Sequence, residues 1–299
     1  MLCLFCLVLF MTRRLYLHTS GIVWIVSGVQ TLATVPLGPA DLPSSSVLRQ
    51  YWGLYLPLYF VVGLLVNYGI FSVPHHYVSK TLPAHLKNFV DLFERRFRAQ
   101  PAGLAVVRGA LLGSCYLAGH ACLLLLLGNW KIAAAGIFWF AGAVAESGAG
   151  AQWVVSLSVL VAIAATWPLV ALPVALARRI TARRSILLGS AVLVWLVAAV
   201  PVHGATVYPT LFLYIFTAIQ ALFFALVFLR YDLLTCLFSM FTVQTWLMSY
   251  ALFRIFGKAE PWPSSAGLLL WFSLALVGTA IWFRPQLAAS WRRLAAVFE

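Results

Sequence analysis

Residues Ile186–Trp246 read ILLGSAVLVWLVAAVPVHGATVYPTLFLYIFTAIQALFFALVFLRYDLLTCLFSMFTVQTW, and this stretch decides the fold. It contains three apolar runs, which are interrupted only by the short breaks 201–204 and 230–232. A helix of about 20 apolar residues crosses the hydrocarbon core of a bilayer. The stretch therefore predicts three consecutive transmembrane helices, over residues 186–201, 207–229 and 233–256.

The whole chain has the composition of a membrane protein. Of its 299 residues, 63% are hydrophobic and only 9% are charged, and its mean hydropathy is +0.97. A soluble domain has about 25% charged residues, so these few charges could not cover a water-facing surface. Porin-type strands would alternate polar and apolar residues, and the runs here do not alternate. We therefore predict an all-α fold, a polytopic transmembrane helix bundle.

The prediction comprises about eight spans. Besides the three named above, they cover residues 19–37, 51–71, 105–127, 152–177 and 267–283. Pro168 and Pro173 should bend the fourth of these spans. Residues 1–18 form an apolar N-terminal segment, which we interpret as the tail of a helix that begins further upstream or as an unusual start. Residues 19–299 then form one membrane domain.

The basic residues indicate how these spans are oriented. When the loop 72–105 faces the cytoplasm, sixteen of the 20 lysines and arginines face the cytoplasm and four face outward. Cytoplasmic loops carry the excess of positive charge, so we predict that both termini are cytoplasmic. A ninth span over the short apolar piece 132–145 would move the arginines of 178–184 outside, so we interpret this piece as re-entrant or interfacial. The same rule accounts for the net charge of +13, and we expect no nucleic-acid partner.

The longest polar segment, 72–105, predicts a basic amphipathic helix over 80–98. Apolar side chains recur there at helical spacing, and charged side chains lie mainly between them. Such a helix suits the membrane surface, where Lys80–Arg98 would bind anionic lipid; alternatively, it packs beneath the bundle. His75, His76 and His85 are expected in the polar loop of this segment.

Three residues are candidates for chemistry. His203 follows Pro201 at a helix end and could act as a proton relay, a metal ligand or a catalytic base, or it bonds backbone groups that the proline frees. His120 lies inside the span 105–127, where an ionisable side chain is a functional candidate, although a neutral histidine bonded to a neighbouring helix fits equally well. Glu146 lies among glycines and could line a cavity or occupy a loop tip.

Other polar residues have structural interpretations. Asp232 begins the span 233–256 beside Arg230, and a carboxylate is favourable at a helix N-terminus, so we expect a capping role for it. The five cysteines lie in apolar runs, and their spacing lacks the paired CxxC pattern of metal sites. We therefore expect buried thiols, no metal and no cofactor.

Two segments resemble the core of the CAAX-protease and bacteriocin-processing (CPBP) family of intramembrane proteases. They are LARRITARRSILLGSAVLVWLVAAVPVHGATVYP, residues 176–209, and FLRYDLLTCLFSMFTVQ, residues 228–244. The resemblance puts the family's first catalytic histidine on His203, its second on Met240, and its Asp or Asn on Gln244. The family's Glu-Glu pair has no counterpart, because no acidic residue lies between Glu146 and Asp232. The resemblance implies a degenerate relative that keeps a polytopic core and lacks the chemistry, since a thioether cannot take up a proton.

The same region also resembles membrane segments fused to bacterial Ser/Thr kinases and phosphatases. We therefore expect a non-catalytic protein of the bacterial cytoplasmic membrane that senses, scaffolds or anchors an unknown protein partner in the lipid bilayer. The alternative enzyme is an active CPBP-type endopeptidase that uses His203 and Glu146. The third class is a transporter, with His120 and His203 in its pathway.

Overall fold

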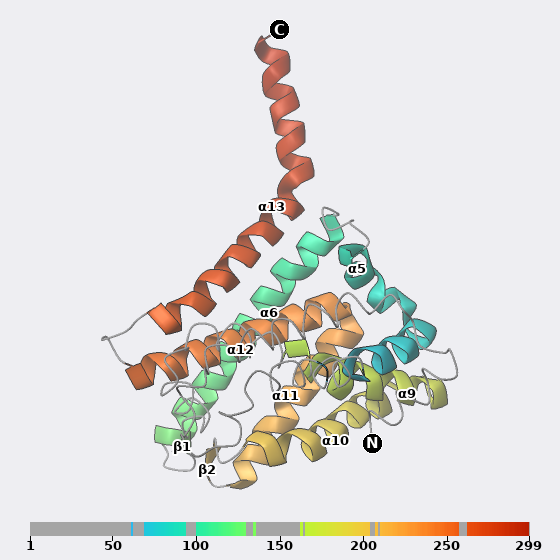
Figure 1. Ribbon diagram of the computed structural model, residues 1–299, viewed down its shortest axis with the longest axis vertical. Coiled ribbons are helices and arrows are strands. Elements are labelled where there is room, and N and C mark those ends of the chain that lie inside the picture. Colours follow the sequence, from blue (N-terminus) through green and yellow to red (C-terminus); the bar gives the residue numbers. More distant parts are fainter. Residues whose placement is uncertain are drawn as a thin grey trace.

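The computed structural model describes residues 61, 69–93, 100–129, 134–135, 162–163, 165–203, 207–208, 210–256 and 262–298 (Figure 1). Apart from two short strands, the elements in these residues are helices, which confirms the all-α class. They are helix 69–81, α5 (Pro83–Phe93), α6 (Gln100–Asn129), β1 (Ala134–Ala135), the π-helix η3 (Ala165–Ala171), α9 (Leu172–Ile180), α10 (Arg184–His203), β2 (Val207–Tyr208), α11 (Thr210–Arg230), α12 (Leu233–Phe256) and α13 (Trp262–Phe298). The strands β1 and β2 pair antiparallel, with Ala134 opposite Tyr208.

Within the described part of the chain, four helices are long and apolar enough to cross a membrane. Their spans are Gln100–Gly128, Leu211–Arg230, Leu233–Tyr250 and Gly267–Gln286, and α10 contributes the shorter apolar helix Arg184–Ala198. These five segments coincide with the spans predicted over 105–127, 207–229, 233–256, 267–283 and 186–201. The span predicted over 19–37 and the segment 1–18 lie outside the described residues, and 51–71 and 152–177 are described only in part.

The helix α12 is the centre of the bundle. It packs against α6, α13, α5 and η3, and 78% of the residues in its span Leu233–Tyr250 are buried. The helices α10 and α11 form a second packed pair (Figure 1). Because η3 contacts α10, α11 and α12, it joins this pair to the helices around α12.

Two glycines of α6 explain how closely α6 approaches α12. A Cβ atom at Gly109 would lie 2.7 Å from the carbonyl oxygen of Thr235, and one at Gly113 would lie 2.6 Å from that of Ser239. Both contacts are with backbone, so a larger residue could be accommodated only if the helices separated. Small residues four apart are a common way to bring membrane helices into contact.

The prolines Pro168 and Pro173 interrupt a regular α-helix where the sequence predicted a bend. Pro168 lies inside the π-helix η3, and the chain resumes α-helical geometry as α9 with Pro173 in its first turn. Proline lacks the N–H of an α-helical hydrogen bond and is tolerated in a first turn. The buried side chains Trp167 and Val170 anchor η3 in the core.

The region around His75 and His76 corrects the prediction of a polar loop. Both histidines lie in the helix 69–81 and are buried, at 9% and 6% exposure. Their neighbours Phe71 and Val78 belong to the hydrophobic core, and the His75 ring lies 5.8 Å from that of Trp167. The loop was predicted because the local composition is polar. The structure instead packs this segment as a helix against η3.

Several arginines gather at one end of the bundle, which we call the basic end: Arg108, Arg179, Arg184 and Arg230. The guanidinium of Arg108 lies 4.7 Å from the centre of the Tyr231 ring, and that of Arg179 lies 5.4 Å from the Tyr77 ring. Arg184 and Arg230 line one pocket. The strands β1 and β2 lie at the opposite end, and the last part of α13 extends away from the bundle (Figure 1).

Candidate functional site

The predicted pair His203 and Glu146 is only partly visible. His203 is the last residue of α10, which places its backbone at the end of the bundle opposite Arg184. Its side chain lies outside the described part of the structure, and so does Glu146. A contact between these two residues therefore stays a prediction.

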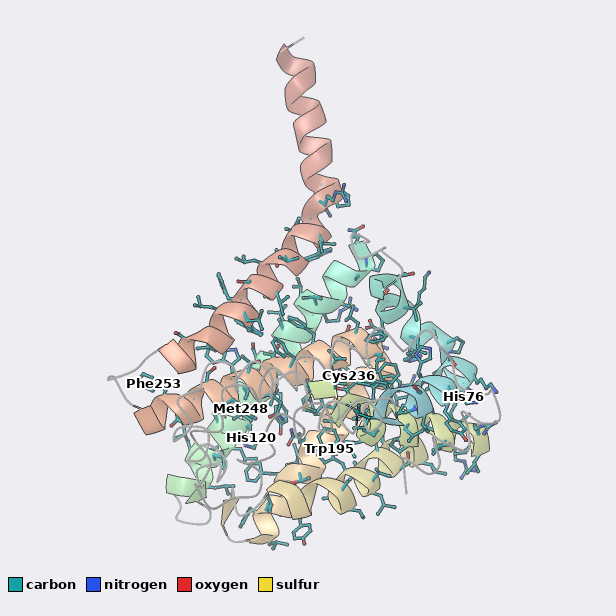
Figure 2. The ribbon with its side chains drawn as sticks, in the orientation of Figure 1. His76, His120, Trp195, Cys236, Met248 and Phe253 are labelled. Carbon is teal, nitrogen blue, oxygen red and sulfur yellow. The ribbon has the colours of Figure 1, made fainter. Side chains whose placement is uncertain are left out.

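His120 lies within α6, as the sequence predicted, and its ring is half-buried among aromatic side chains (Figure 2). It stacks on Tyr116, with ring centres 5.7 Å apart, and meets Phe216 of α11 edge-on at 4.7 Å. Tyr116 in turn contacts Phe223 at 5.0 Å. These contacts describe a packing position between α6 and α11, and none of them is with a carboxylate.

Asp232 caps α12, which confirms the predicted structural role. Its Oδ1 accepts a 2.8 Å hydrogen bond from the backbone N–H of Thr235, and its Oδ2 accepts a 3.0 Å bond from the Thr235 hydroxyl. The side-chain amide of Asn88 in α5 donates a further bond to Oδ2, at 3.2 Å. The carboxylate is 6% exposed, so this capping cluster ties α5 to the start of α12.

The turn between α11 and α12 has further ties beside this cap. The Nε2 atom of His85 lies 3.4 Å from the carbonyl oxygen of Leu229. The thiol of Cys236 donates a 3.4 Å bond to the carbonyl oxygen of Phe224 and is wholly buried (Figure 2). The expectation of a buried thiol is confirmed for Cys236, whereas Cys115 and Cys122 are exposed on α6.

Met240 and Gln244 occupy the positions where the resemblance would put a second histidine and an Asp or Asn. Met240 is 0% exposed and Gln244 is 6% exposed. The Gln244 amide donates to the Met240 sulfur at 3.8 Å. Neither a thioether nor a neutral amide is a base for a reacting water.

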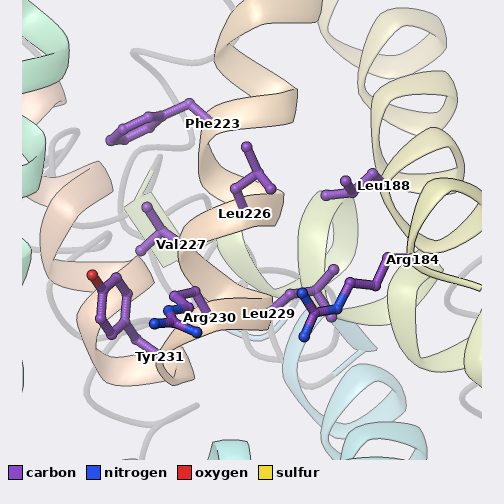
Figure 3. A pocket seen from close by; sticks show the side chains of 8 residues that line it. All are labelled: Arg184, Leu188, Phe223, Leu226, Val227, Leu229, Arg230 and Tyr231. Atoms are coloured by element: carbon purple, nitrogen blue, oxygen red, sulfur yellow. The ribbon is translucent and has the colours of Figure 1, made fainter.

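A pocket of about 330 Å³ lies between α10 and α11 at the basic end (Figure 3). Its lining combines apolar side chains with two arginines: Arg184 and Leu188 of α10, Phe223, Leu226, Val227, Leu229 and Arg230 of α11, and Tyr231 after it. Figure 3 shows both arginines at one end of the pocket and Phe223, Leu226 and Leu188 at the other. The pocket thus has an apolar end and a cationic end.

This pocket was not predicted from the sequence, although the lengths of the two helices contained a signal for it. The helices α10 and α11 are consecutive and of similar length, 20 and 21 residues. An antiparallel pair of that kind brings the first residue of one helix beside the last residue of the other. Arg184 and Arg230 occupy those two positions, so their proximity could have been derived from the predicted spans.

Among the described residues, no group of three or more His, Cys, Asp or Glu side chains could hold a metal ion. Among the described polar side chains, the two arginines are the ones that line a pocket. No family model, no curated protein and no solved structure matches the chain. The functional interpretation accordingly rests on the residues themselves.

Proposed function

We propose that the chain is a non-catalytic multi-pass membrane protein with a sensing, scaffolding or anchoring role, and that it is a degenerate relative of CPBP-type membrane cores. The observation that supports this proposal is the hydrogen bond between the buried side chains of Met240 and Gln244 in α12. Hydrolysis within a membrane needs a base for water and donors for the oxyanion. The buried thioether of Met240 cannot act as the base, and the Gln244 amide donates a hydrogen bond to that thioether.

The position of Asp232 supports the same proposal. Asp232 lies at the basic end and is engaged in the cap of α12. His203 ends α10 at the opposite end of the bundle, and about 30 Å of hydrocarbon separates the two ends of a span. Asp232 therefore cannot assist His203, and Glu146 remains the one carboxylate proposed for an enzyme.

Peptide cleavage tests this proposal directly. The purified parent chain, Glu146→Gln and His203→Ala would be incubated with membrane peptides and prenylated peptides, and products would be followed by mass spectrometry. We expect no cleavage above a protein-free control in any sample. Cleavage by the parent chain that disappears in both variants would restore the endopeptidase.

We also propose eight spans in the bacterial cytoplasmic membrane, with both termini and the basic end in the cytoplasm. The contact between Arg179 and Tyr77 supports an even number of crossings between residues 81 and 178, because both residues lie at one end. That parity agrees with a re-entrant or interfacial segment 132–145.

Single cysteines test this orientation in a background without the five native cysteines. Lys80→Cys and Ala182→Cys probe exposed positions at the basic end, and Gly128→Cys probes an exposed position near the other end of α6. A membrane-impermeant thiol reagent should label only position 128 in intact cells. Labelling at 80 and 182 instead would invert the orientation, and labelling at only one of those two would mean an odd number of crossings between them.

Anionic lipid at Lys80–Arg98 remains part of the proposal in a modified form. The apolar face of α5 is covered by protein, because Leu86 and Phe89 are buried in the core. Binding would therefore depend on exposed basic side chains such as Lys80 and Lys87. In the full chain, Lys80→Gln with Lys87→Gln should weaken adsorption of the basic end to anionic vesicles at low salt, by about 1 kcal/mol per residue; unchanged adsorption would remove this part of the proposal.

A further inference from the structure

The pocket between α10 and α11 opens toward the same medium as the outer surface of these helices. Leu226 in its wall is 47% exposed, and on the same two helices Leu193 and Leu222 are 64% and 41% exposed. Large apolar side chains that are exposed on a membrane-spanning bundle face lipid. An acyl chain could therefore enter the pocket from the bilayer without crossing water.

The cationic end of the pocket has a surplus of positive charge. Within the described residues, neither Arg184 nor Arg230 forms an ion pair, and no acidic side chain lines the pocket. The nearest carboxylate in sequence, Asp232, is turned inward to the cap of α12. Arg108 stacks on Tyr231, which lines the pocket, and so adds a third cation nearby.

The position of Arg184 requires an explanation beyond membrane orientation. It is the first residue of α10, and a cation at a helix N-terminus opposes the helix dipole. The positive-inside rule explains why arginines lie at this end of the bundle. It does not explain why one arginine from each of two neighbouring helices lines the same pocket, whereas an anionic ligand between them would benefit from both guanidinium groups and from the helix N-terminus.

We infer that this pocket binds an anionic phospholipid of the surrounding leaflet, with its phosphate between Arg184 and Arg230 and an acyl chain along Leu188, Phe223 and Leu226. Phe223 lies two turns of α11 from Arg230, roughly 10 Å along the helix axis, which separates a headgroup from the upper part of a chain. A pocket of about 330 Å³ holds these parts only. The remaining lipid extends over the exposed surface of α10 and α11. Basic pockets between membrane helices are a recurrent way to recognise anionic headgroups.

Lipid titrations of the delipidated full chain in detergent test this site, with native mass spectrometry as the readout. Phosphatidylglycerol and phosphatidylcholine with identical acyl chains would be compared. We expect phosphatidylglycerol to form a one-to-one complex with a dissociation constant roughly tenfold lower than that of phosphatidylcholine, because charge-assisted bonds to the two arginines favour the anion. Equal affinities for the two lipids would overturn the inference.

Variants separate the pocket from the general charge of the basic end. The double substitution Arg184→Gln with Arg230→Gln should raise the dissociation constant for phosphatidylglycerol roughly tenfold. The matched control, Arg178→Gln with Arg183→Gln, removes two exposed arginines outside the pocket and should change it by less than about twofold. The same loss in both pairs would indicate diffuse attraction to a basic surface and would contradict the inference.

A third variant tests the apolar half and keeps every charge. Leu226→Trp places a larger side chain in the wall of the pocket and should also weaken the phosphatidylglycerol complex. Unchanged binding in Leu226→Trp would mean that no acyl chain occupies the pocket. Displacement of the lipid by millimolar inorganic phosphate would likewise reduce the site to a phosphate site without a lipid, and we expect no such displacement.

Discussion

The helices α12 and α13 are both apolar enough to span a membrane, yet they occupy opposite environments. In the span Leu233–Tyr250 of α12, 78% of the residues are buried, against 11% in the span Gly267–Gln286 of α13. The two helices pack against each other and against α6 (Figure 1). Length and apolar composition therefore identify the spans, but they do not rank them from centre to periphery.

The two helices also differ in the polarity of their side chains. Buried hydroxyl groups recur along α12, at Thr235, Ser239, Thr242, Thr245 and Ser249. The outer face of α13 carries large apolar side chains instead, such as Leu269, Phe272 and Leu276. Hydrocarbon offers no hydrogen bonds and repels no apolar group, so a bilayer favours the more polar helix inside and the more apolar helix outside.

Truncating one large side chain in each helix should show the largest difference. Met240→Ala in α12 removes a side chain with 0% exposure and should lower the free energy of unfolding by about 2–5 kcal/mol, because it leaves a cavity. Leu276→Ala in α13 truncates a side chain that is 54% exposed and should change it by less than about 0.5 kcal/mol. Denaturant unfolding in detergent, followed by circular dichroism, measures both; similar losses would mean that the burial difference between the helices is not real.

The spans themselves were predictable because about 20 apolar residues have few alternatives to a helix in a bilayer. The cap at Asp232 was predictable for a similar reason, since a carboxylate before an apolar run has a local physical role. The order of the helices from the centre of the bundle to its periphery was not predictable, because it depends on contacts between segments that are distant in the sequence. The pair Gly109 and Gly113 was nevertheless a readable sign of a close helix contact.

Substitutions at Gly113 and Gly119 of α6 test the close contact between α6 and α12. Gly113→Leu should destabilise the fold by roughly 1–3 kcal/mol or more, since its Cβ would already lie 2.6 Å from the Ser239 carbonyl oxygen. Gly119→Leu is the matched control in the same helix, because a Cβ there meets nothing within 4 Å. Equal stability of the two variants, measured by thermal unfolding in detergent, would show that α6 and α12 do not approach through glycine.

The candidate site was predicted least well. His120 was expected deep in a span and lies there, but its contacts are aromatic. His75 and His76 were assigned to a loop and are buried in a helix. Histidine counts as a polar residue in a composition, but a histidine ring packed against Trp167 or Phe216 behaves largely as an aromatic side chain. Composition alone could therefore not assign these residues to the core.

The start of α12 can be weakened without touching its apolar contacts. Asp232→Ala removes the acceptor of the Thr235 N–H bond and should cost about 1–2 kcal/mol of unfolding free energy. Asp232→Asn keeps an acceptor for the Thr235 N–H, but it replaces Oδ2, which accepts bonds from the Thr235 hydroxyl and from Asn88, with an amide donor. It should therefore recover only part of that loss. A loss in Asp232→Asn equal to that in Asp232→Ala would mean that the charge and the bonds of Oδ2, and not the bond to the Thr235 N–H, stabilise this turn.

The smallest expected effect concerns a single bond that joins the two helices compared above. The indole N–H of Trp271 in α13 donates a 2.9 Å hydrogen bond to the Thr242 hydroxyl in α12. Membrane interhelical hydrogen bonds contribute about 0.6 kcal/mol on average, so Trp271→Phe should lower the free energy of unfolding by roughly that amount plus the lost ring contact with Trp246. The double variant with Thr242→Val separates the two contributions.

If the hydrogen bond couples the two residues, Thr242→Val should lower the free energy of unfolding by about 0.6 kcal/mol less in the Trp271→Phe background than in the parent chain. Additive losses would show that α13 is held by apolar contact with α6 and α12 alone. That outcome would sharpen the contrast between the helices, because the hydroxyl groups of α12 would then contribute nothing to the packing of α13. A clear coupling would instead mean that the hydroxyl of Thr242, one of the buried hydroxyl groups of α12, stabilises the packing of the peripheral helix α13.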